Sequence, residues 1–379
     1  MSTRILVAAG SGRQPEGWRE VVARHAEQLG VESTWREAPD AEALAAILAA
    51  AGDEHDAVVL VPGELAAAGS VSAAVRELPI PVACAEPAPL TDRTVVHGAC
   101  DRVVHGRGRR SITGALRWAV AAARDPGTTV TYGPSPAQVG DLRIPPGADA
   151  APVVVLFHGG FWLDVWERDL MDGLAVALTG HGWATWNVEY RRTGPSGGGW
   201  PATWENACAA VDAVADLADD HAIDPDRVVV LGHSAGATLA VYPLARPGLG
   251  DHAPGTPPRI RPRALVSLAG LLDLEAAAAA AIGDGAVTAC LGDPATHPDR
   301  YALASPHRLV PLGAPTLLLH GHADRLVPAD QSRAFATTAR DAGDDVTLDL
   351  VDTDHFAIIH PDEPAIATVA SWLSALARG

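Results

Sequence analysis

The sequence contains no lysine, and all 28 of its basic residues are arginine. This absence excludes a lysine-dependent phosphate-binding loop and catalysis through a lysine Schiff base. Acidic residues are in excess, which gives a formal net charge of -18 at pH 7. Because an acidic surface repels phosphate backbones, we expect no nucleic-acid partner.

Long apolar segments and paired cysteines are also missing. No stretch approaches the roughly 20 apolar residues of a membrane span, and the N-terminus has no signal-peptide pattern, so we expect a cytoplasmic protein without membrane association. Cys84, Cys100, Cys208 and Cys290 lie far apart and include no Cys-x-x-Cys pair. The expectation is therefore buried free thiols, with no zinc site, no disulfide framework and no cofactor.

The 379 residues are too many for one ordinary core, so two domains are expected. A stretch rich in Pro and Gly at 125–136 interrupts the pattern of strands and helices, and it predicts domains at 1–125 and 126–379. In the first domain, apolar strand candidates alternate with helical patterns, which predicts a flavodoxin-like parallel sheet of about five strands. These strand candidates are residues 4–10, 31–37, 57–63, 81–87 and 101–108.

The second domain has the pattern of a larger α/β unit. It opens with TVTYG and VGDLRIPPG, which read as a short antiparallel pair. Helical patterns separate the strands that follow, and together they predict a mixed sheet of about eight strands. The further strand candidates are residues 153–157, 184–190, 227–232, 264–270, 315–321 and 346–352.

The pentapeptide Gly232-His233-Ser234-Ala235-Gly236 follows an apolar strand directly and precedes a helical pattern. This context is typical of a nucleophile elbow, where flanking glycines allow a sharp turn that exposes the serine hydroxyl. The alternative is an ordinary strand-to-helix turn with a capping serine. We predict that Ser234 is a nucleophile.

A serine nucleophile needs a base and an acid that orients the base. His355, in the loop before the last helix, is the expected base, and His360 is its nearby rival. Asp324, which follows the preceding strand, is the expected acid, and the order Ser234, Asp324, His355 is that of α/β-hydrolases. The alternative acids are Asp330, Asp352 and Asp354.

The stretch HGGFW at 158–162 ends a predicted central strand. Its glycines leave room for substrate, so the N–H groups of Gly160 and Phe161, with that of Ala235, are expected to form an oxyanion hole. We expect His158 to fix this loop rather than to transfer protons, and we include it with His233 among the residues next to substrate. Taken alone, HGGFW could also be a simple glycine turn.

Tryptophan is abundant, with 10 Trp against four Phe and four Tyr, and several lie between HGGFW and the next helix. Trp162 and Trp200, beside glycine-rich stretches, are predicted to bind substrate, because indoles suit a flat aromatic group. Trp183 and Trp186 are as well explained by core packing. The segment 271–303, in the usual place of a lid, is short, which disfavours a bulky lipid substrate.

Residues 128–379 resemble the α/β-hydrolase superfamily, in particular esterases that carry HGG followed by an aromatic residue and Trp. Four stretches carry this resemblance: HGGFW, VEYRR, GHSAG, and ASPHRLVPLGAPTLLLHGHADRLVP followed by DHF. Within the superfamily the segment is most similar to kynurenine formamidases (arylformamidases) and small carboxylesterases. The resemblance implies a small ester or amide substrate, with aromatic ones among the candidates, and no cofactor.

Residues 1–124 resemble type II 3-dehydroquinate dehydratases in the order and spacing of their segments. That family needs a tyrosine base and an asparagine, but this sequence has no Tyr before Tyr132 and no Asn before Asn187. Glu86 and Pro87 stand where the family's Glu-Val-His strand would supply its histidine. The resemblance therefore implies a degenerate, non-catalytic domain, and it favours a homo-oligomer assembled through this domain.

Three functions are consistent with these observations. The leading one is a serine hydrolase that forms an acyl-enzyme intermediate on Ser234. A second is a binding or scaffold protein in which neither domain is catalytic. A third keeps the Ser-His pair but uses it in a lyase, acyltransferase or cyclase, which would be distinguished from a hydrolase by its products.

Overall fold

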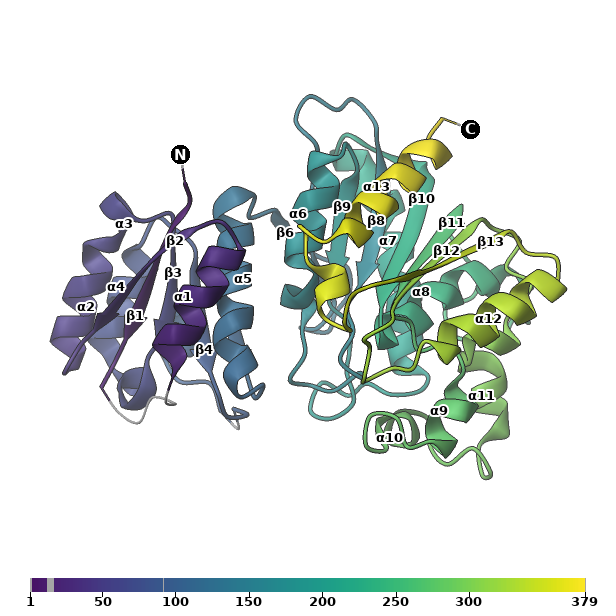
Figure 1. Ribbon diagram of the computed structural model, residues 1–379, viewed down its shortest axis with the longest axis horizontal. Helices are drawn as coiled ribbons and strands as arrows, with labels where there is room; N and C mark the ends of the chain where they lie inside the picture. Colours follow the sequence, from purple (N-terminus) through teal and green to yellow (C-terminus); the bar gives the residue numbers. More distant parts are fainter. Residues whose placement is uncertain (1, 12–16, 91, 379) are drawn as a thin grey trace. The chain divides into compact units, whose positions relative to one another are not determined.

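The computed structural model describes residues 2–11, 17–90 and 92–378. Its chain divides into two compact units, Met1–Pro126 and Gly127–Gly379, and Figure 1 shows the elements of both. The division falls inside the stretch rich in Pro and Gly. The loop that follows the first strand runs into residues 12–16, which lie outside the described residues.

The N-terminal unit contains a five-stranded parallel sheet of order β2-β1-β3-β4-β5. This is the flavodoxin-like order, so the predicted fold of this unit is confirmed. The strands are β1 (Arg4–Ala9), β2 (Glu32–Glu37), β3 (Ala57–Val61), β4 (Val82–Glu86) and β5 (Arg102–His105). The helices are α1 (Trp18–Gln28), α2 (Ala41–Ala49), α3 (Ala51–Glu54), α4 (Gly69–Glu77) and α5 (Arg109–Arg124).

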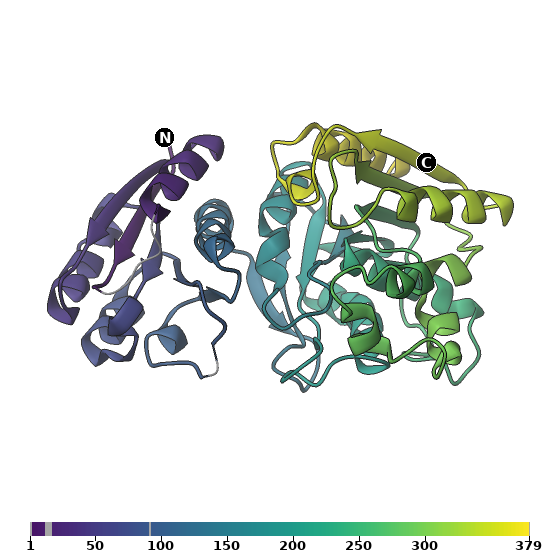
Figure 2. The ribbon, with the colours of Figure 1, turned by 60° about the horizontal axis from the view of Figure 1, so that its bottom comes forward.

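Both faces of this sheet are covered by helices, because successive side chains of a strand point to opposite faces. On β1, Ile5 and Val7 pack in one cluster with residues of α1 and α5, whereas Leu6 packs in another with residues of α2 and α4. Figures 1 and 2 show helices on the two sides of the sheet. A sheet buried on both faces explains the continuous apolar runs of its strands.

The C-terminal unit contains an eight-stranded mixed sheet of order β13-β12-β11-β10-β8-β9-β7-β6, as predicted. Only the pairs β6–β7 and β7–β9 are antiparallel among the described strands, and β6–β7 is the short pair expected at the start of the unit. The first four strands are β6 (Thr128–Thr131), β7 (Val139–Arg143), β8 (Ala151–Phe157) and β9 (Ala184–Val188). The others are β10 (Ile223–His233), β11 (Ala264–Leu268), β12 (Thr316–Gly321) and β13 (Val346–Val351).

Helices cover this second sheet on both faces. They are α6 (Asp172–Gly180), α7 (Ala202–Asp220), α8 (Ala235–Ala245), α9 (Leu274–Ala279), α10 (Ala286–Leu291), α11 (Pro298–Ala304), α12 (Asp330–Asp341) and α13 (Pro364–Leu376). The expected lid segment forms the short helices α9, α10 and α11, which lie together at one end of the unit (Figures 1 and 2). No helix in the described part of the chain is long and apolar enough to span a membrane.

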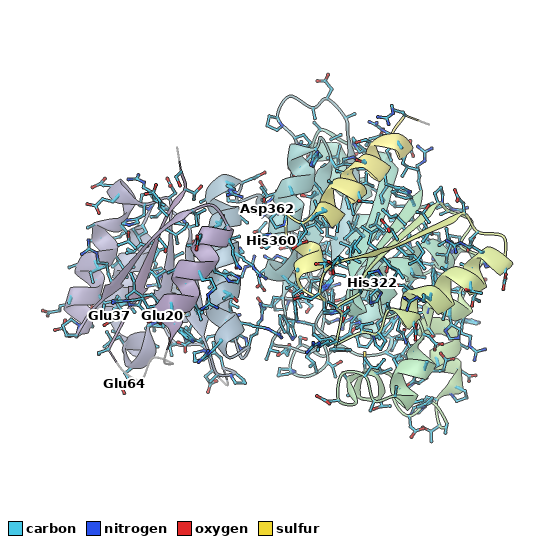
Figure 3. The ribbon with its side chains drawn as sticks, in the orientation of Figure 1. Glu20, Glu37, Glu64, His322, His360 and Asp362 are labelled. Atoms are coloured by element: carbon cyan, nitrogen blue, oxygen red, sulfur yellow. The ribbon has the colours of Figure 1, made fainter. Side chains whose placement is uncertain are left out.

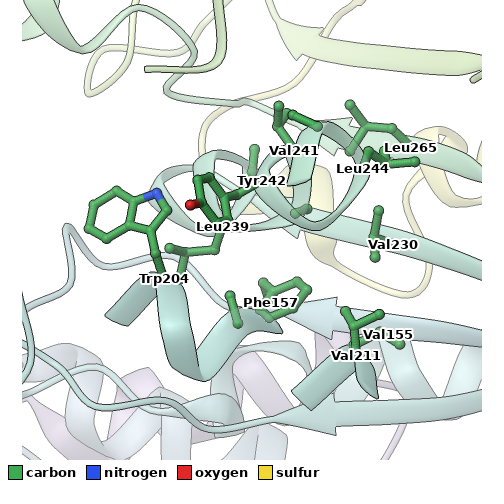
Figure 4. Packing of buried hydrophobic residues seen from close by; sticks show 14 of the residues in the cluster. Val155, Phe157, Trp204, Val211, Val230, Leu239, Val241, Tyr242, Leu244 and Leu265 are labelled. Atoms are coloured by element: carbon green, nitrogen blue, oxygen red, sulfur yellow. The ribbon is translucent and has the colours of Figure 1, made fainter. Parts of the chain in front are cut away.

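The central strands carry the core of the C-terminal unit. Val155 and Phe157 of β8 and Val230 of β10 pack with residues of α7 and α8, as Figure 4 shows. Val154 and Leu156 point to the opposite face and pack with residues of α6 and α13. This packing fixes the carboxyl ends of β8 and β10 side by side, and HGGFW and GHSAG begin at those ends.

Candidate active site

Ser234 occupies the turn between β10 and α8. Its φ of 54° and ψ of -124° are strained for a residue with a side chain, and such strain is characteristic of a nucleophile elbow. Gly236 allows the following helix to approach β8, since a Cβ at this position would lie 2.2 Å from the carbonyl oxygen of Phe157. The sequence GHSAG therefore forms the turn that was predicted.

The three residues predicted as a catalytic triad meet at this turn. Ser234 Oγ lies 3.0 Å from His355 Nε2, and His355 Nδ1 lies 2.6 Å from Asp324 Oδ2. His355 can therefore accept the serine proton at Nε2 while Nδ1–H donates to the carboxylate. Residues from three loops, which are separated by about 30 to 120 positions in the sequence, thus form one hydrogen-bonded chain.

The Asp324 carboxylate is held in its charged form. Its Oδ1 accepts the backbone N–H groups of Leu326 and Val327, both at 2.9 Å. Burial alone would raise the pKa of Asp324, but hydrogen bonds from His320 and His355 outweigh it and hold the pKa well below its usual range. A carboxylate that stays charged beside His355 is able to stabilise an imidazolium at that residue.

His320 is a supporting residue that the sequence analysis missed. Its Nε2 lies 3.3 Å from Asp324 Oδ2, and its Nδ1 lies 2.7 Å from Ser332 Oγ. The side chain is fully buried on β12, four residues before the acid. The spacing of His320 and Asp324 in LLLHGHAD is a local signal that could have identified this pair.

The alternative base and acids lie outside the hydrogen-bonded chain. His360 lies beside the exposed Asp362, 3.7 Å away (Figure 3). Asp330 pairs with Arg333 at the start of α12, and Asp354 accepts the N–H groups of the two residues after His355. The remaining alternative, Asp352, is exposed.

The HGGFW loop lies directly against the nucleophile. A Cβ at Gly159 would lie 2.8 Å from Ser234 Cβ, so only glycine fits there. Among the described residues, the N–H groups of Gly160, Phe161 and Ala235 have no protein acceptor. Three unpaired N–H groups near a serine nucleophile are the groups that an oxyanion requires.

His158 supports this loop from within the protein. Its Nδ1 lies 2.8 Å from the carbonyl oxygen of Gly159, and its Nε2 lies 3.0 Å from Glu189 Oε1. Tyr190 stacks on the ring at 4.3 Å and donates its hydroxyl to the His158 carbonyl. This geometry agrees with the expectation that His158 fixes the loop, and its side chain is fully buried.

Glu189 and Tyr190 belong to VEYRR, a stretch that the sequence analysis quoted without assigning it a role. Burial would raise the pKa of Glu189, but Arg192, His158 and Arg168 outweigh it and hold that pKa far below its usual range. The second carboxylate oxygen of Glu189 accepts the N–H of Arg168 at 3.0 Å. A buried charged residue thus connects the end of β9 to the HGGFW loop.

His233 and Trp162 are also buried, and neither contacts the surface of the site. His233 Nε2–H donates to the carbonyl oxygen of His355 at 2.8 Å, and burial, with a contribution from His355, lowers the pKa of His233 to about 3. Trp162 packs against Trp204 with ring centroids 5.8 Å apart. In this structure His233 therefore contacts the loop that carries His355, and Trp162 packs in the core.

Trp200 is only partly buried and packs edge-on against Trp204 and Tyr242. The sequence analysis missed a second aromatic pair that is nearer to the base. Trp166 and Phe356 stack with centroids 5.5 Å apart, and Phe356 contacts the ring of His355 at 5.3 Å. The position of Phe356 directly after His355 is the sequence signal for this pair.

The fold and the arrangement of these residues define the C-terminal unit as an α/β-hydrolase. The chain belongs to the BD-FAE family, whose model matches residues 141–338, more than half of the chain. That segment includes Ser234 and Asp324 and ends before His355.

Known proteins with a similar sequence or structure agree with this assignment. Esterase LipQ of Mycobacterium tuberculosis is 27% identical over 201 residues, which cover 51% of this chain and 47% of LipQ, so the match spans about half the length of that relative. A truncated carbohydrate esterase from gut microbiota has a TM-score of 0.58 at 21% identity, over 66% of this chain and 96% of its own. Propionate-bound Est2, an esterase of Thermogutta terrifontis, has a TM-score of 0.54 at 21% identity. The match covers 67% of this chain and 94% of Est2. At 21% identity, these two structures show only that the C-terminal unit shares their fold.

Proposed function

We propose that the protein is a serine hydrolase that cleaves small carboxylic esters through an acyl-enzyme intermediate. The observation that carries this proposal is the hydrogen-bonded chain from Ser234 through His355 to Asp324, with distances of 3.0 and 2.6 Å. The names of LipQ and of the similar structures, which are esterases, support ester hydrolysis as the reaction.

In the proposed mechanism, Ser234 Oγ attacks the ester carbonyl while His355 Nε2 accepts the serine proton. The N–H groups of Gly160, Phe161 and Ala235 stabilise the oxyanion. His355 then returns the proton to the leaving alcohol as the acyl-enzyme forms. A water molecule activated by His355 releases the acid and restores the serine.

From the side chains around the triad we expect a preference for a small acyl group and a flat leaving group. Phe161 of the oxyanion loop packs against Gly283 of the lid segment, where an added Cβ would lie 2.6 Å from the ring. The half-buried Trp166 and Phe356 offer aromatic surface beside the base. Since aromatic surface favours aromatic partners, aryl esters and aryl formamides are the substrates to compare.

For the N-terminal unit we propose a non-catalytic, dehydroquinase-like domain that mediates self-association. The support is its flavodoxin-like strand order together with the absence from its sequence of the tyrosine and asparagine that the dehydratase reaction needs. Size-exclusion chromatography with light scattering of the full chain would test the association: a monomer at micromolar concentration contradicts it.

The hydrolase proposal is tested with the Ser234→Ala variant on 4-nitrophenyl acetate and on N-formylkynurenine. We expect kcat on the ester to fall by about 10⁴-fold or more, because the nucleophile is lost. Ser374→Ala, a serine on α13, is the control and should retain wild-type kcat. Free acid as the product identifies hydrolysis, and the ratio of kcat/KM for the two substrates decides between esterase and formamidase.

Labelling with a fluorophosphonate probe gives an independent readout of the same proposal. The wild-type chain should be labelled at Ser234, and Ser234→Ala should not. A wild-type chain that neither turns over these substrates nor reacts with the probe contradicts the hydrolase and favours a scaffold protein. Transfer of the acyl group to an added acceptor without free acid favours an acyltransferase.

A further inference from the structure

Three side chains of types that bind metals meet in the N-terminal unit, which contains none of the triad residues. They are Cys84 and Glu86 on β4 and His97 in the short 3-10 helix His97–Ala99. One ligand atom from each residue, the thiol sulfur, a carboxylate oxygen and an imidazole nitrogen, lies within 4.8 Å of the others. Cys84 and Glu86 share a face of β4 because they are two residues apart on a strand.

We propose that Cys84, Glu86 and His97 bind a divalent transition-metal ion, with Zn²⁺ as the ion that this ligand set fits best. Thiolate, imidazole and carboxylate are the three ligand types of protein zinc sites. His97 Nε2 and Glu86 Oε1 are 3.1 Å apart, so the metal takes the place of the proton that these two atoms share. The fourth position of a tetrahedral site is then filled by water.

Cys100 follows the short 3-10 helix that carries His97, and its thiol donates to the carbonyl oxygen of Val96 at 3.3 Å. It is not one of the three residues whose ligand atoms converge. The cluster supplies one thiol, one imidazole and one carboxylate from residues 84–97 of the chain.

The surroundings of the cluster are those of a formed site. Cys84 is fully buried and His97 is 2% exposed, which holds the ligand side chains in place. Thr94 orients the ring of His97: its backbone N–H donates to Nδ1 at 3.2 Å, and its Oγ1 lies 3.1 Å from the same nitrogen. With a metal on Nε2, the proton would move to Nδ1 and be donated to Thr94 Oγ1, as the other ring nitrogen of a zinc-binding histidine donates to an acceptor.

A second group of similar composition lacks these properties. Asp273, Glu275 and His307 also approach one another, but all three are partly exposed and none is a thiol. Asp273 accepts the N–H of Ala276 as the N-cap of α9, and Glu275 pairs with Arg308 at 3.0 Å. The start of α9 explains this group without a metal.

The proposal is tested on the full-length chain, stripped of metal with EDTA in the presence of reductant and then desalted without oxygen. Titration with Co²⁺ should produce the near-ultraviolet absorption of a thiolate–cobalt bond, and Zn²⁺ should remove it, since Zn²⁺ binds such sites more tightly. Elemental analysis after addition of Zn²⁺ should find one zinc per chain. The absorption band identifies this cluster, because the group at α9 has no sulfur.

Single substitutions identify which side chains bind the metal. Cys84→Ser should abolish the thiolate–cobalt band, and Glu86→Gln, which retains a hydrogen-bonding partner for His97, should weaken binding at least about tenfold. Cys208→Ser, a buried cysteine of the other unit, is the matched control and should keep the band. Circular dichroism verifies that each variant is folded.

The proposal is overturned if the reduced chain binds no stoichiometric Zn²⁺ at micromolar concentration. It is equally overturned if Glu86→Gln and Cys84→Ser, both folded, bind Co²⁺ as the wild-type chain does. A Cys84–Cys100 disulfide detected by mass spectrometry, together with no metal binding after its reduction, identifies a redox pair instead of a metal site.

Discussion

The two units of this chain have the same type of architecture and different chemistry. In both, helices cover a largely parallel sheet, and a few polar side chains gather beside its strands. In the C-terminal unit the gathered residues are a serine, a histidine and an aspartate in hydrogen-bonded order. In the N-terminal unit they are a cysteine, a glutamate and a histidine within 4.8 Å of one another. The comparison teaches that the α/β architecture places side chains together, and that their identity decides what they can do.

The backbone around the two clusters also differs. Ser234 stands on a strained turn with unpaired N–H groups nearby, whereas Cys84 lies within a regular strand. A nucleophile needs an open face and a site for the developing negative charge, and a metal ligand needs neither. The backbone at Ser234 therefore suits catalysis, whereas the backbone at Cys84 suits metal binding.

Among the variants that test the difference between the two units, we expect the largest loss of kcat from a change at Asp324, the proposed acid of the triad. Asp324→Asn should lower kcat by about 10³- to 10⁴-fold, because the amide no longer holds the imidazole in the required tautomer. Steady-state kinetics on 4-nitrophenyl acetate measures the effect. Asp330→Asn, which changes an aspartate whose side chain is 84% exposed, is the control and should leave kcat unchanged. Equal losses in both variants would reject Asp324 as the orienting acid.

A smaller effect is expected from the residue that supports the oxyanion loop. Glu189→Gln removes a buried charge that faces Arg192 and Arg168, so we expect the unfolding free energy to fall by about 3 kcal/mol. The loop should lose its fixed position, and kcat should fall by about 10- to 100-fold with little change in KM. Denaturant unfolding and kinetics measure the two effects.

The control for this prediction is Glu205→Gln, at a half-exposed partner of Arg191. Because exposed ion pairs contribute little, we expect a change below about 1 kcal/mol and wild-type kinetics. If Glu189→Gln has wild-type kcat at a temperature where it is fully folded, Glu189 has no role in positioning the loop.

His233 should make the unfolding free energy of the protein depend on pH. Its pKa is about 3 in the folded chain and about 6.5 when unfolded, so between these values only the unfolded chain binds the proton. The unfolding free energy should therefore fall as the pH is lowered from about 6.5 towards 3, by about 1.4 kcal/mol per pH unit from this group alone. His233→Gln should flatten this slope in urea titrations at several pH values. An unchanged slope would show that His233 does not contribute to the acid sensitivity.

The smallest effect on activity is expected from a core substitution in the N-terminal unit. Leu44 is fully buried there, so Leu44→Ala should destabilise that unit by about 3 kcal/mol. Since the triad and its supports all lie in the other unit, kcat should stay within about twofold of wild type. Calorimetry and kinetics test this, and a parallel loss of kcat would show that the two units are energetically coupled.

Sequence patterns predicted the parts of the site that depend on short-range structure. GHSAG between a strand and a helix indicated the elbow, and the carboxyl ends of later strands indicated Asp324 and His355. The structure brings these three together because adjacent parallel strands deliver their following loops to one edge of the sheet. Burial was predicted less well: Trp162, His158 and His233 stand in the motifs but face inward.

What the sequence by itself determined is the alternation of elements, the position of the nucleophile turn and the order of the triad, since each is written in neighbouring residues. Tertiary structure alone decided that Glu189 contacts His158 of the HGGFW loop, because β9 and β8 must first pair. It likewise decided that Cys84, Glu86 and His97 meet, although their spacing matched no metal motif. Contacts between side chains distant in sequence follow from strand order and loop closure, and neither can be read from a local pattern.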